Sequence, residues 1–573
     1  MKVRSREVLL MNLLFQSKKL IFVLIFTACG NLLLGQEQNT ESGKLFIEGQ
    51  VRDKQTKEPL AFVNIYNKST KKATSSTFDG HFRIFLKHRG DTIVFSYVGY
   101  KQETLFYNQR SGFVKLLMEQ SSTALNEITI VANDNYLYNL LSDCKKNQDE
   151  VKTEAKTYYL LESYVNNQQV ELVECYYNGI VSGYDLEELK IKNGRIALKK
   201  MNDRFFISLE SSKAISLLKL FQHNAYFPDN PFTLSKRNLK KYYELELLKT
   251  YEDEHGKTIY LIEFKPKRNT ENLFSGKVWI NYALHKIIKI DLEAINTKKH
   301  PFLPIKVSMD NIQKVDLNIS KTFDDFNNKS VFNHIGFDYT IQYKSRDSLV
   351  YTISTNAFLQ AYDFDTHFQL PRFSFSRDNW GDYRKINAIP YNEFFWEHTD
   401  EFKQIDRKNK NNNYFNVEAD ITSESLFKAN RFFIRSLLLY AYIKWNADRI
   451  WFADFDSDST THNAKNQMYY SEEFKLNVKL FADMYFIQDS VQLITATILD
   501  PIGSYYNFPK DKTAISFINI YFDLMEIQRS EFEREFLNSD KSIATFNSLY
   551  ITLKLYASTL HNTFAWKCAH PFQ

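Results

Sequence analysis

The sequence predicts a multidomain protein of the α+β class, with an N-terminal β-sandwich, a central antiparallel β-rich domain and a C-terminal helical bundle. Apolar and polar residues alternate with a period of two in short runs between residues 44 and 120, and the chain reads mostly as strands from residue 156 to about residue 375. Beyond residue 417 the apolar period becomes about 3.6, as in amphipathic helices. A chain of 573 residues is also too long for a single hydrophobic core.

The first alternating runs lie between Lys44 and Gln120 and are separated by turn residues. They cover residues 45–50, 61–66, 82–86, 93–97 and 114–118. Short strands at this spacing predict a small β-sandwich. Asp79–Gly80 predicts a hairpin turn, because glycine adopts the positive φ that such a turn needs. Gly99 predicts a similar bend after the next strand.

Four motifs in this region resemble the carboxypeptidase-like regulatory domain, a transthyretin-like sandwich. They are Ile47–Val51 (IEGQV), Pro59–Ile65 (PLAFVNI), Thr77–Phe82 (TFDGHF) and Ile93–Tyr100 (IVFSYVGY). The resemblance covers residues 44–121. It implies an accessory module without an active site, of the kind that stands at the front of envelope proteins in bacteria with TonB-dependent receptors.

Residues 1–35 are predicted to be a secretory signal peptide. Lys18–Lys19 precedes the apolar run Leu20–Ala28, and Gly35 is a small residue at the expected cleavage position. Two alternatives stay open, namely lipoprotein processing at Cys29 and an uncleaved membrane anchor. The predicted location is exported, either periplasmic or associated with the outer membrane.

The central β-rich domain is predicted over residues 134–400, with short helices at Asp134–Asn147 and Ser211–Gln222. The clearest strands are Thr157–Val165, Tyr243–Leu248, Thr258–Phe264, Gly276–Asn281 and Lys286–Glu293, with turns at Asp253–Gly256 and Asn281–Leu284. A separate short strand, Leu125–Val131, is predicted to connect this domain to the module.

Three passages of the central domain, Tyr260–Pro266, Phe274–Ile280 and His285–Ile290, resemble two groups of proteins. One is a family of unknown function that follows the regulatory module. The other is the curved half-barrel of outer-membrane lipoprotein carriers, which implies an apolar concavity for an acyl chain or a peptide. The alternative is that the aromatic residues fill an ordinary core, and the pattern favours the core.

A polar linker is predicted over residues 401–416, around the low-complexity run Asp406–Asn413. A helical domain, residues 417–573, follows it. Its predicted helices are Ser423–Trp445, Glu472–Leu499, Thr513–Leu537 and Ser542–Trp566, which together predict a small bundle. The helices carry too many charged residues to span a bilayer.

Two groups of residues have part of a metal-binding pattern. His398 and Glu401 have the H-x-x-E spacing of zinc carboxypeptidases, but the later histidines fall in the predicted helical region and no α/β pattern surrounds the motif. The aspartates of Asp454–Asp458 alternate as in a calcium loop. The positions that an EF-hand fills with glycine and glutamate are here Ser459 and Lys465, so a solvated acidic loop is favoured.

Composition and missing motifs limit the function. The net charge of +5 is small for this length and gives no argument for nucleic acid. The sequence has no nucleophile elbow, P-loop, dinucleotide fingerprint or C-x-x-C motif. Cys144 and Cys175 could form a disulfide in an oxidising compartment, but buried free thiols are favoured.

We therefore predict no catalytic, cofactor or metal site. The expected protein is a non-enzymatic, exported envelope protein that binds or scaffolds a protein or an envelope component. The first alternative is a periplasmic lipid or lipoprotein carrier that uses the curved sheet. The second is a zinc carboxypeptidase that uses His398 and Glu401.

Overall fold

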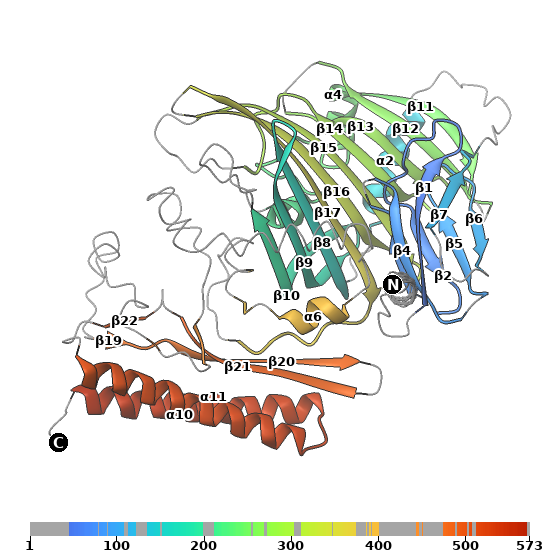
Figure 1. The fold of residues 1–573 in the computed structure, drawn as a ribbon. Helices are drawn as coiled ribbons and strands as arrows, with labels where there is room; N and C mark the ends of the chain where they lie inside the picture. Colours follow the sequence, from blue (N-terminus) through green and yellow to red (C-terminus); the bar gives the residue numbers. More distant parts are fainter. Residues whose placement is uncertain are drawn as a thin grey trace, which may run out of the picture.

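The computed structural model describes residues 45–121, 135–148, 152–198, 211–302, 311–373, 386–399, 443–450, 474–506 and 511–569, with short gaps inside several of these ranges. Figure 1 shows a small N-terminal unit, a large curved sheet and a C-terminal unit in which long helices lie against strands. Several predictions lie outside the described residues: the signal peptide, the strand Leu125–Val131, the polar linker, the part of the helix at 423–442, and Asp454–Asp458.

Two small sheets form the N-terminal unit, which we call the module. The sheet with the order β4-β1-β7 contains β1 (Leu45–Asp53), β4 (His81–Leu86) and β7 (Phe113–Met118). The sheet with the order β3-β2-β5-β6 contains β2 (Asn64–Asn67), β3 (Lys72–Ser75), β5 (Thr92–Ser96) and β6 (Glu103–Phe106). Both sheets contribute to one core, which includes Ile47 and Phe95. Gly80 and Gly99 have φ angles of 75° and 88°, as their predicted turns require.

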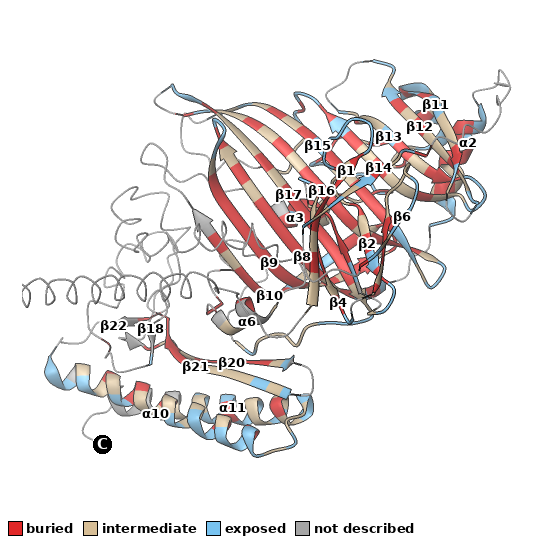
Figure 2. Cartoon of the chain, turned by 45° about the vertical axis from the view of Figure 1, so that its right-hand side comes forward, coloured by how far each residue is buried: buried red, intermediate tan, exposed pale blue. Residues whose placement is uncertain are grey.

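The central domain is one antiparallel sheet of ten strands in the order β10-β9-β8-β17-β16-β15-β14-β13-β12-β11. These strands are β8 (Lys152–Val165), β9 (Gln168–Ser182), β10 (Asp185–Leu198), β11 (Tyr243–Glu252), β12 (Thr258–Pro266), β13 (Ser275–Asn281), β14 (Lys286–Ala294), β15 (Asn311–Phe326), β16 (Lys329–Lys344) and β17 (Val350–Phe364). All five individually predicted strands are among them. Figure 2 shows that much of the sheet is buried, because both of its faces are covered.

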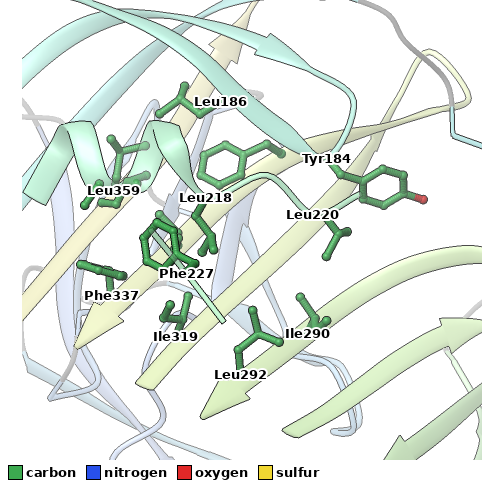
Figure 3. Packing of buried hydrophobic residues seen from close by; sticks show 14 of the residues in the cluster. Tyr184, Leu186, Leu218, Leu220, Phe227, Ile290, Leu292, Ile319, Phe337 and Leu359 are labelled. Carbon is green, nitrogen blue, oxygen red and sulfur yellow. The ribbon is translucent and has the colours of Figure 1, made fainter. Parts of the chain in front are cut away.

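The chain's own helices and loops cover one face of this sheet, which we call the helix-covered face. They are α2 (Asn135–Lys146), α3 (Ser211–Leu217), α4 (Lys236–Tyr242) and the irregular segment 218–234. Leu218, Phe227 and Phe337 belong to one large core with strand residues such as Ile290 (Figure 3). The expectation that aromatic residues fill a core here is met by these contacts.

Helix α3 ends at Leu217, before the predicted end at Gln222. The Leu217 carbonyl accepts a hydrogen bond from Asn224 Nδ2 at 2.9 Å, and the Leu220 N–H donates to the Asp185 carboxylate at 3.0 Å. These side chains satisfy backbone groups that another turn of helix would have used. The chain therefore leaves the helix and crosses the sheet as an irregular segment.

The opposite face of the sheet, which we call the module-covered face, carries a second apolar cluster. It contains Tyr158, Leu160, Tyr176 and Phe358 from the strands, with Phe395 and Trp396 from α6 (Glu393–His398), and Phe62 of the module and Tyr485 of the C-terminal unit pack against it. One face of the sheet therefore holds a core within the central domain, and the other face receives the other two units.

The prediction of a helix over Glu472–Leu499 is wrong. Most of this segment is a hairpin of β20 (Val478–Ile487) and β21 (Ser490–Leu499), with the short strands β18 (Ile443–Lys444), β19 (Phe474–Lys475) and β22 (Tyr505–Tyr506) nearby. Leu480 and Met484 pack against helices α10 (Lys512–Leu537) and α11 (Ile543–Ala569), whereas Phe481 belongs to the core of the central domain. Side chains that alternate between two cores on opposite sides require a strand, because successive residues of a strand point to opposite faces.

The C-terminal unit is thus a β-hairpin covered by a helical hairpin, and the predicted helices Thr513–Leu537 and Ser542–Trp566 correspond to α10 and α11. The strand β18 also replaces the last residues of the helix predicted at Ser423–Trp445. No helix in the described part of the chain combines the length and the apolarity needed to cross a membrane.

A buried ion pair joins the C-terminal unit to the central sheet. Lys192 Nζ lies 2.5 Å from Asp483 Oδ1, and both side chains are 1% exposed. Lys192 also donates to the Gln369 carbonyl at 2.7 Å, and Asp483 accepts from the Met484 N–H at 3.0 Å and from the Tyr485 hydroxyl. Burial lowers the pKa of Lys192 and raises the pKa of Asp483, so these hydrogen bonds are needed to hold the charged pair.

Replacing Asp483 by alanine is expected to lower the free energy of unfolding by about 3–5 kcal/mol, because the substitution leaves the Lys192 charge buried without its carboxylate. Urea denaturation monitored by circular dichroism measures this loss. The double variant Lys192→Met/Asp483→Leu removes both charges and should lose much less. Equal losses for the single and the double variant would contradict this account of the pair.

Candidate functional site

The module is anchored on the sheet by Phe62. Its ring stacks on Phe358 with a centroid distance of 4.9 Å and an interplanar angle of 4°, and it lies 4.8 Å from the His334 ring. Gly336 makes room for it, since a Cβ at that position would lie 2.9 Å from the Phe62 ring. Phe62 has a φ of 64°, a left-handed conformation that costs about 1–2 kcal/mol, and β2 begins only at Asn64, although the sequence predicts extended chain from residue 61.

Polar contacts fix the module beside this ring. The Ser75 hydroxyl donates to Gln360 Oε1 at 2.8 Å, and Lys249 Nζ donates to the Ser121 carbonyl at 2.5 Å. The Lys289 ammonium lies 5.6 Å from the centre of the Tyr97 ring. The module is therefore held at several points of the sheet, and its orientation is defined.

A cavity of about 250 Å³ lies between the module and the sheet next to the Phe62 contact. We call it the interdomain cleft. It is lined by Phe62, Asn64, Ser75 and Ser96–Tyr100 of the module and by Tyr251–Asp253, Ile259, Ile288, Thr322–Asp324, Asn333–His334 and Gln360 of the central domain. Because both units supply its walls, the cleft exists only when they are docked.

The sheet register places a row of polar side chains at the base of the cleft. Lys289 on β14 pairs with Thr322 on β15, Thr322 lies beside His334 on β16, and His334 pairs with Gln360 on β17. Direct cross-strand partners share a face, so these side chains lie next to one another. The Thr322 hydroxyl is 2.6 Å from His334 Nδ1.

Burial and the positive charge of Lys289 lower the pKa of His334 to about 3, so the imidazole is neutral at physiological pH. Burial also disfavours the charged form of Lys289. Tyr97 and Asp291 outweigh that effect and raise the pKa of Lys289, whose Nζ lies 3.2 Å from Asp291. The row therefore carries one positive charge, and an aspartate already pairs with it.

Carboxylates form the polar rim of the cleft. Asp324 accepts a hydrogen bond from Asn333 Nδ2 at 3.2 Å. Desolvation by the surrounding protein raises the pKa of Asp324, and the negative charge of Asp325 raises it further. The residue is nevertheless partly accessible to solvent. Glu252 and Asp253 line the same cavity, and Lys289 of the row at its base supplies a positive charge beside them.

The described structure does not bring together the residues that have part of a metal-binding pattern in the sequence. His398 ends α6, and Glu401 lies outside the described residues, as do the aspartates of Asp454–Asp458. No group of three metal-ligating side chains occurs among the residues that the structure describes. Cys144 and Cys175 are both buried free thiols, so the alternative of a disulfide between them is wrong.

Family comparisons agree with this arrangement. Residues 47–130 match the CarboxypepD_reg-like domain, and residues 134–346 match a family of unknown function, DUF5686. The chain therefore carries a CarboxypepD_reg-like domain followed by a DUF5686 domain. This order is the one that the sequence motifs predicted. No curated protein matches the chain.

Solved structures with some likeness to the chain are distant. A putative outer membrane lipoprotein-sorting protein domain from Vibrio parahaemolyticus has 12% identity and a TM-score of 0.19, and the match covers 42% of this chain and 94% of that one. A LolA superfamily protein from Nitrosomonas europaea has 11% identity, a TM-score of 0.17 and coverages of 40% and 92%. A putative membrane-associated protein of unknown function from Bacteroides fragilis has 9% identity, a TM-score of 0.11 and coverages of 56% and 99%. At these TM-scores the likeness carries no argument about fold or function.

Replacing Gly336 by valine is expected to loosen the module, because the new side chain occupies the position of the Phe62 ring. Overpacking of this kind costs about 1–3 kcal/mol. Hydrogen exchange measured by mass spectrometry should show faster exchange in β2 and in the middle of β16. Thr340→Val, on the same strand and face, is the matched control, and equal exchange in both variants would contradict the contact.

Asp338 on β16 is expected to make stability depend on pH. Its Oδ1 is buried without a hydrogen-bond partner among the described residues, and burial raises its pKa from 3.8 to about 7. A raised pKa penalises the charged form in the folded state, so the penalty is absent near pH 4 and complete above pH 7. Asp338→Asn should therefore raise the free energy of unfolding by about 1–2 kcal/mol at pH 8, after allowance for solvent screening.

Urea denaturation of both proteins at pH 4 and pH 8 measures this effect. The variant and the wild-type protein should have the same stability at pH 4. A gain in stability of equal size at both pH values would show that ionisation of Asp338 is not its cause.

Proposed function

We propose that the protein is an exported, non-enzymatic envelope protein that binds a ligand or a group of a partner in the interdomain cleft. The observation that carries this proposal is the cavity of about 250 Å³, whose walls come from both the module and the sheet. A module without an active site then has a direct role, because it completes a binding site that neither unit forms alone.

The chemistry of the cleft favours binding over catalysis. A general base works best when its pKa lies near the operating pH. Burial and Lys289 keep the pKa of His334 near 3, and Nδ1 is engaged by Thr322, so the imidazole is a weak base at neutral pH. The polar row at the base of the cleft thus consists of hydrogen-bonding groups that suit recognition.

The packing on the helix-covered face argues against a lipid site on the curved sheet and therefore supports the interdomain cleft as the binding site. Leu218, Leu220, Phe227 and Phe232 of the segment that crosses this face are buried in the core of the sheet. An acyl chain could enter only if these side chains moved out. The interdomain cleft needs no such rearrangement.

The proposed export has its own test. Cleavage after Gly35 would leave a mature chain that begins at Gln36, whereas lipoprotein processing would leave a lipid on Cys29. Mass spectrometry of the N-terminal peptide, from protein recovered in the envelope fraction of its host, should identify one of these two ends. An unprocessed chain in the cytoplasmic fraction would contradict export.

Filling the cleft is expected to abolish binding. Ser96 lines the cavity at the end of β5, so Ser96→Trp places an indole in it. Thr104→Trp is the matched control, since Thr104 is exposed on the neighbouring strand β6. Native mass spectrometry of each protein, purified from the periplasm and membranes of its host, should show a bound species on the wild type and on Thr104→Trp but not on Ser96→Trp.

Two results would contradict the cleft proposal. One is a wild-type chain recovered without any bound species. The other is a species that Ser96→Trp retains as fully as the wild type. If that retained species were a lipid, it would support the alternative of a carrier that uses the helix-covered face.

A further inference from the structure

We infer that two copies of the chain associate through the side of α10 and α11 that points away from β20 and β21. We call this side the outer face; it includes Ile520 and Ile527 of α10 and Ile551 and Leu555 of α11. The inference goes beyond the proposed function and does not depend on the interdomain cleft. The exposure, symmetry, area and charge of the outer face each support it.

The apolar residues of the outer face are exposed on helices whose other side is buried (Figure 1). Ile520 and Ile527 are each 52% exposed, and Ile551 and Leu555 are 60% and 65% exposed. Each lies two residues from a buried residue, which is about 200° around a helix, so all four point away from the core. The buried residues in question, which share one core with the strands, are Ile518, Met525 and Leu553.

Helix α11 lacks the charged outer side that a solvent-exposed helix normally has. Between Ile543 and Leu560 its one charged residue is Lys554, and the ring of Tyr556 is also exposed. A helix with apolar residues on all sides is normally buried. Contiguous apolar patches on a protein surface mark contacts with another protein or with a membrane. The outer face therefore has the composition of an interaction surface.

The exposed positions of α11 have a symmetric spacing that suits a second copy. Ser548, Ile551, Leu555 and Ser558 are all exposed and lie three, four and three residues apart, so the spacing is the same in both directions. A two-fold axis at the level of Leu553 therefore places Ile551 of one copy on Leu555 of the other, and Ser548 on Ser558. Such a self-complementary surface is what a closed dimer requires.

The area of the outer face matches that of a stable dimer interface. Helices α10 and α11 have 26 and 27 residues. Each is therefore about 40 Å long, and two packed helices together are about 20 Å wide. The outer face thus covers about 800 Å², which is about the area that each partner buries in a standard stable interface. Helix α11 alone would supply only half of it, so both helices are expected to take part.

The charge of the two helices favours a second copy over a membrane surface. Helix α10 carries three basic and five acidic residues, and α11 carries two lysines, so the two helices have no net charge. Helices that lie on anionic membranes are usually rich in lysine and arginine on their polar side. The uncharged positions of α11 instead allow two identical surfaces to meet without repulsion between like charges.

Sedimentation velocity of the full chain, purified from the envelope fraction of its host, tests the association. A dimer is expected at micromolar concentrations. Leu555→Glu buries an unpaired charge in the interface and should weaken dimerisation at least about tenfold. Ile295→Glu is the matched control, because Ile295 is also 65% exposed and follows β14 in the central domain, and it should leave the dimer unchanged. Unchanged hydrogen exchange in β20 and β21 would show that each variant is folded.

Disulfide formation tests the two-fold arrangement. A mixture of Ile551→Cys and Leu555→Cys chains, one of them isotope-labelled, should form a bond between positions 551 and 555 of different copies under mild oxidation, because these positions face each other. Mass spectrometry of the linked peptides identifies the bond. Either variant alone should link to itself severalfold more slowly, since the axis separates identical positions.

Three results would overturn the inference. The first is a wild-type chain that is monomeric, and the second is a dimer that Leu555→Glu leaves as stable as the wild type. The third is a monomer that binds vesicles of phosphatidylethanolamine and phosphatidylglycerol and loses this binding in Leu555→Glu, since the outer face would then contact lipid. Self-linked chains that form faster than the mixed pair would contradict the two-fold arrangement on which the inference rests.

Discussion

The structure depends on one constraint, the requirement that both faces of the ten-stranded sheet be covered. Successive residues of a strand point to opposite faces. Tyr158 and Tyr159 on β8 illustrate this, since Tyr159 lies in the core under the helices and Tyr158 lies in the cluster on the module-covered face. An apolar set on each face means that helices alone cannot complete the fold. The module and the C-terminal unit bury the apolar side chains on the face of the sheet that the helices do not cover.

The two flanking units use different physical means to attach to the sheet. The module inserts an aromatic ring over Gly336, and the left-handed backbone at Phe62 is compensated by the stacking that it permits. The C-terminal unit adds a strand whose side chains alternate between two cores, with a buried ion pair at Asp483. The attachment of the module depends on the fit of the Phe62 ring over Gly336. The attachment of the C-terminal unit combines apolar packing with the ion pair between Lys192 and Asp483.

The proposed binding site lies where the module does not fill the space above the sheet. Two buried charged groups of the central sheet have close partners: Lys192 lies 2.5 Å from Asp483, and Arg195 lies 2.5 Å from Glu174. In the cleft, by contrast, polar side chains of the module and of the sheet line a cavity of about 250 Å³. This cavity between two docked units is the reason for proposing a binding site in the cleft.

The sequence by itself determined the local features. Strict alternation identified β1, β2, β4, β5 and β7 of the module and five strands of the central sheet, but not β3 and β6. Glycine identified the turns at Gly80 and Gly99, and the helical period of apolar residues identified α2, α10 and α11. Only the tertiary structure decided that the segment Glu472–Leu499 forms strands. An apolar run that is buried on two sides is compatible with a helix or a strand, and its sequence pattern alone does not distinguish them. The cleft was equally hidden, since Tyr97, Tyr251 and Asp324 are far apart in the chain and are joined only by strand register and by the docking of Phe62. The sequence period indicates which face of a helix or strand is buried, because it records which positions are apolar. Only the assembled fold shows which other element packs against that face.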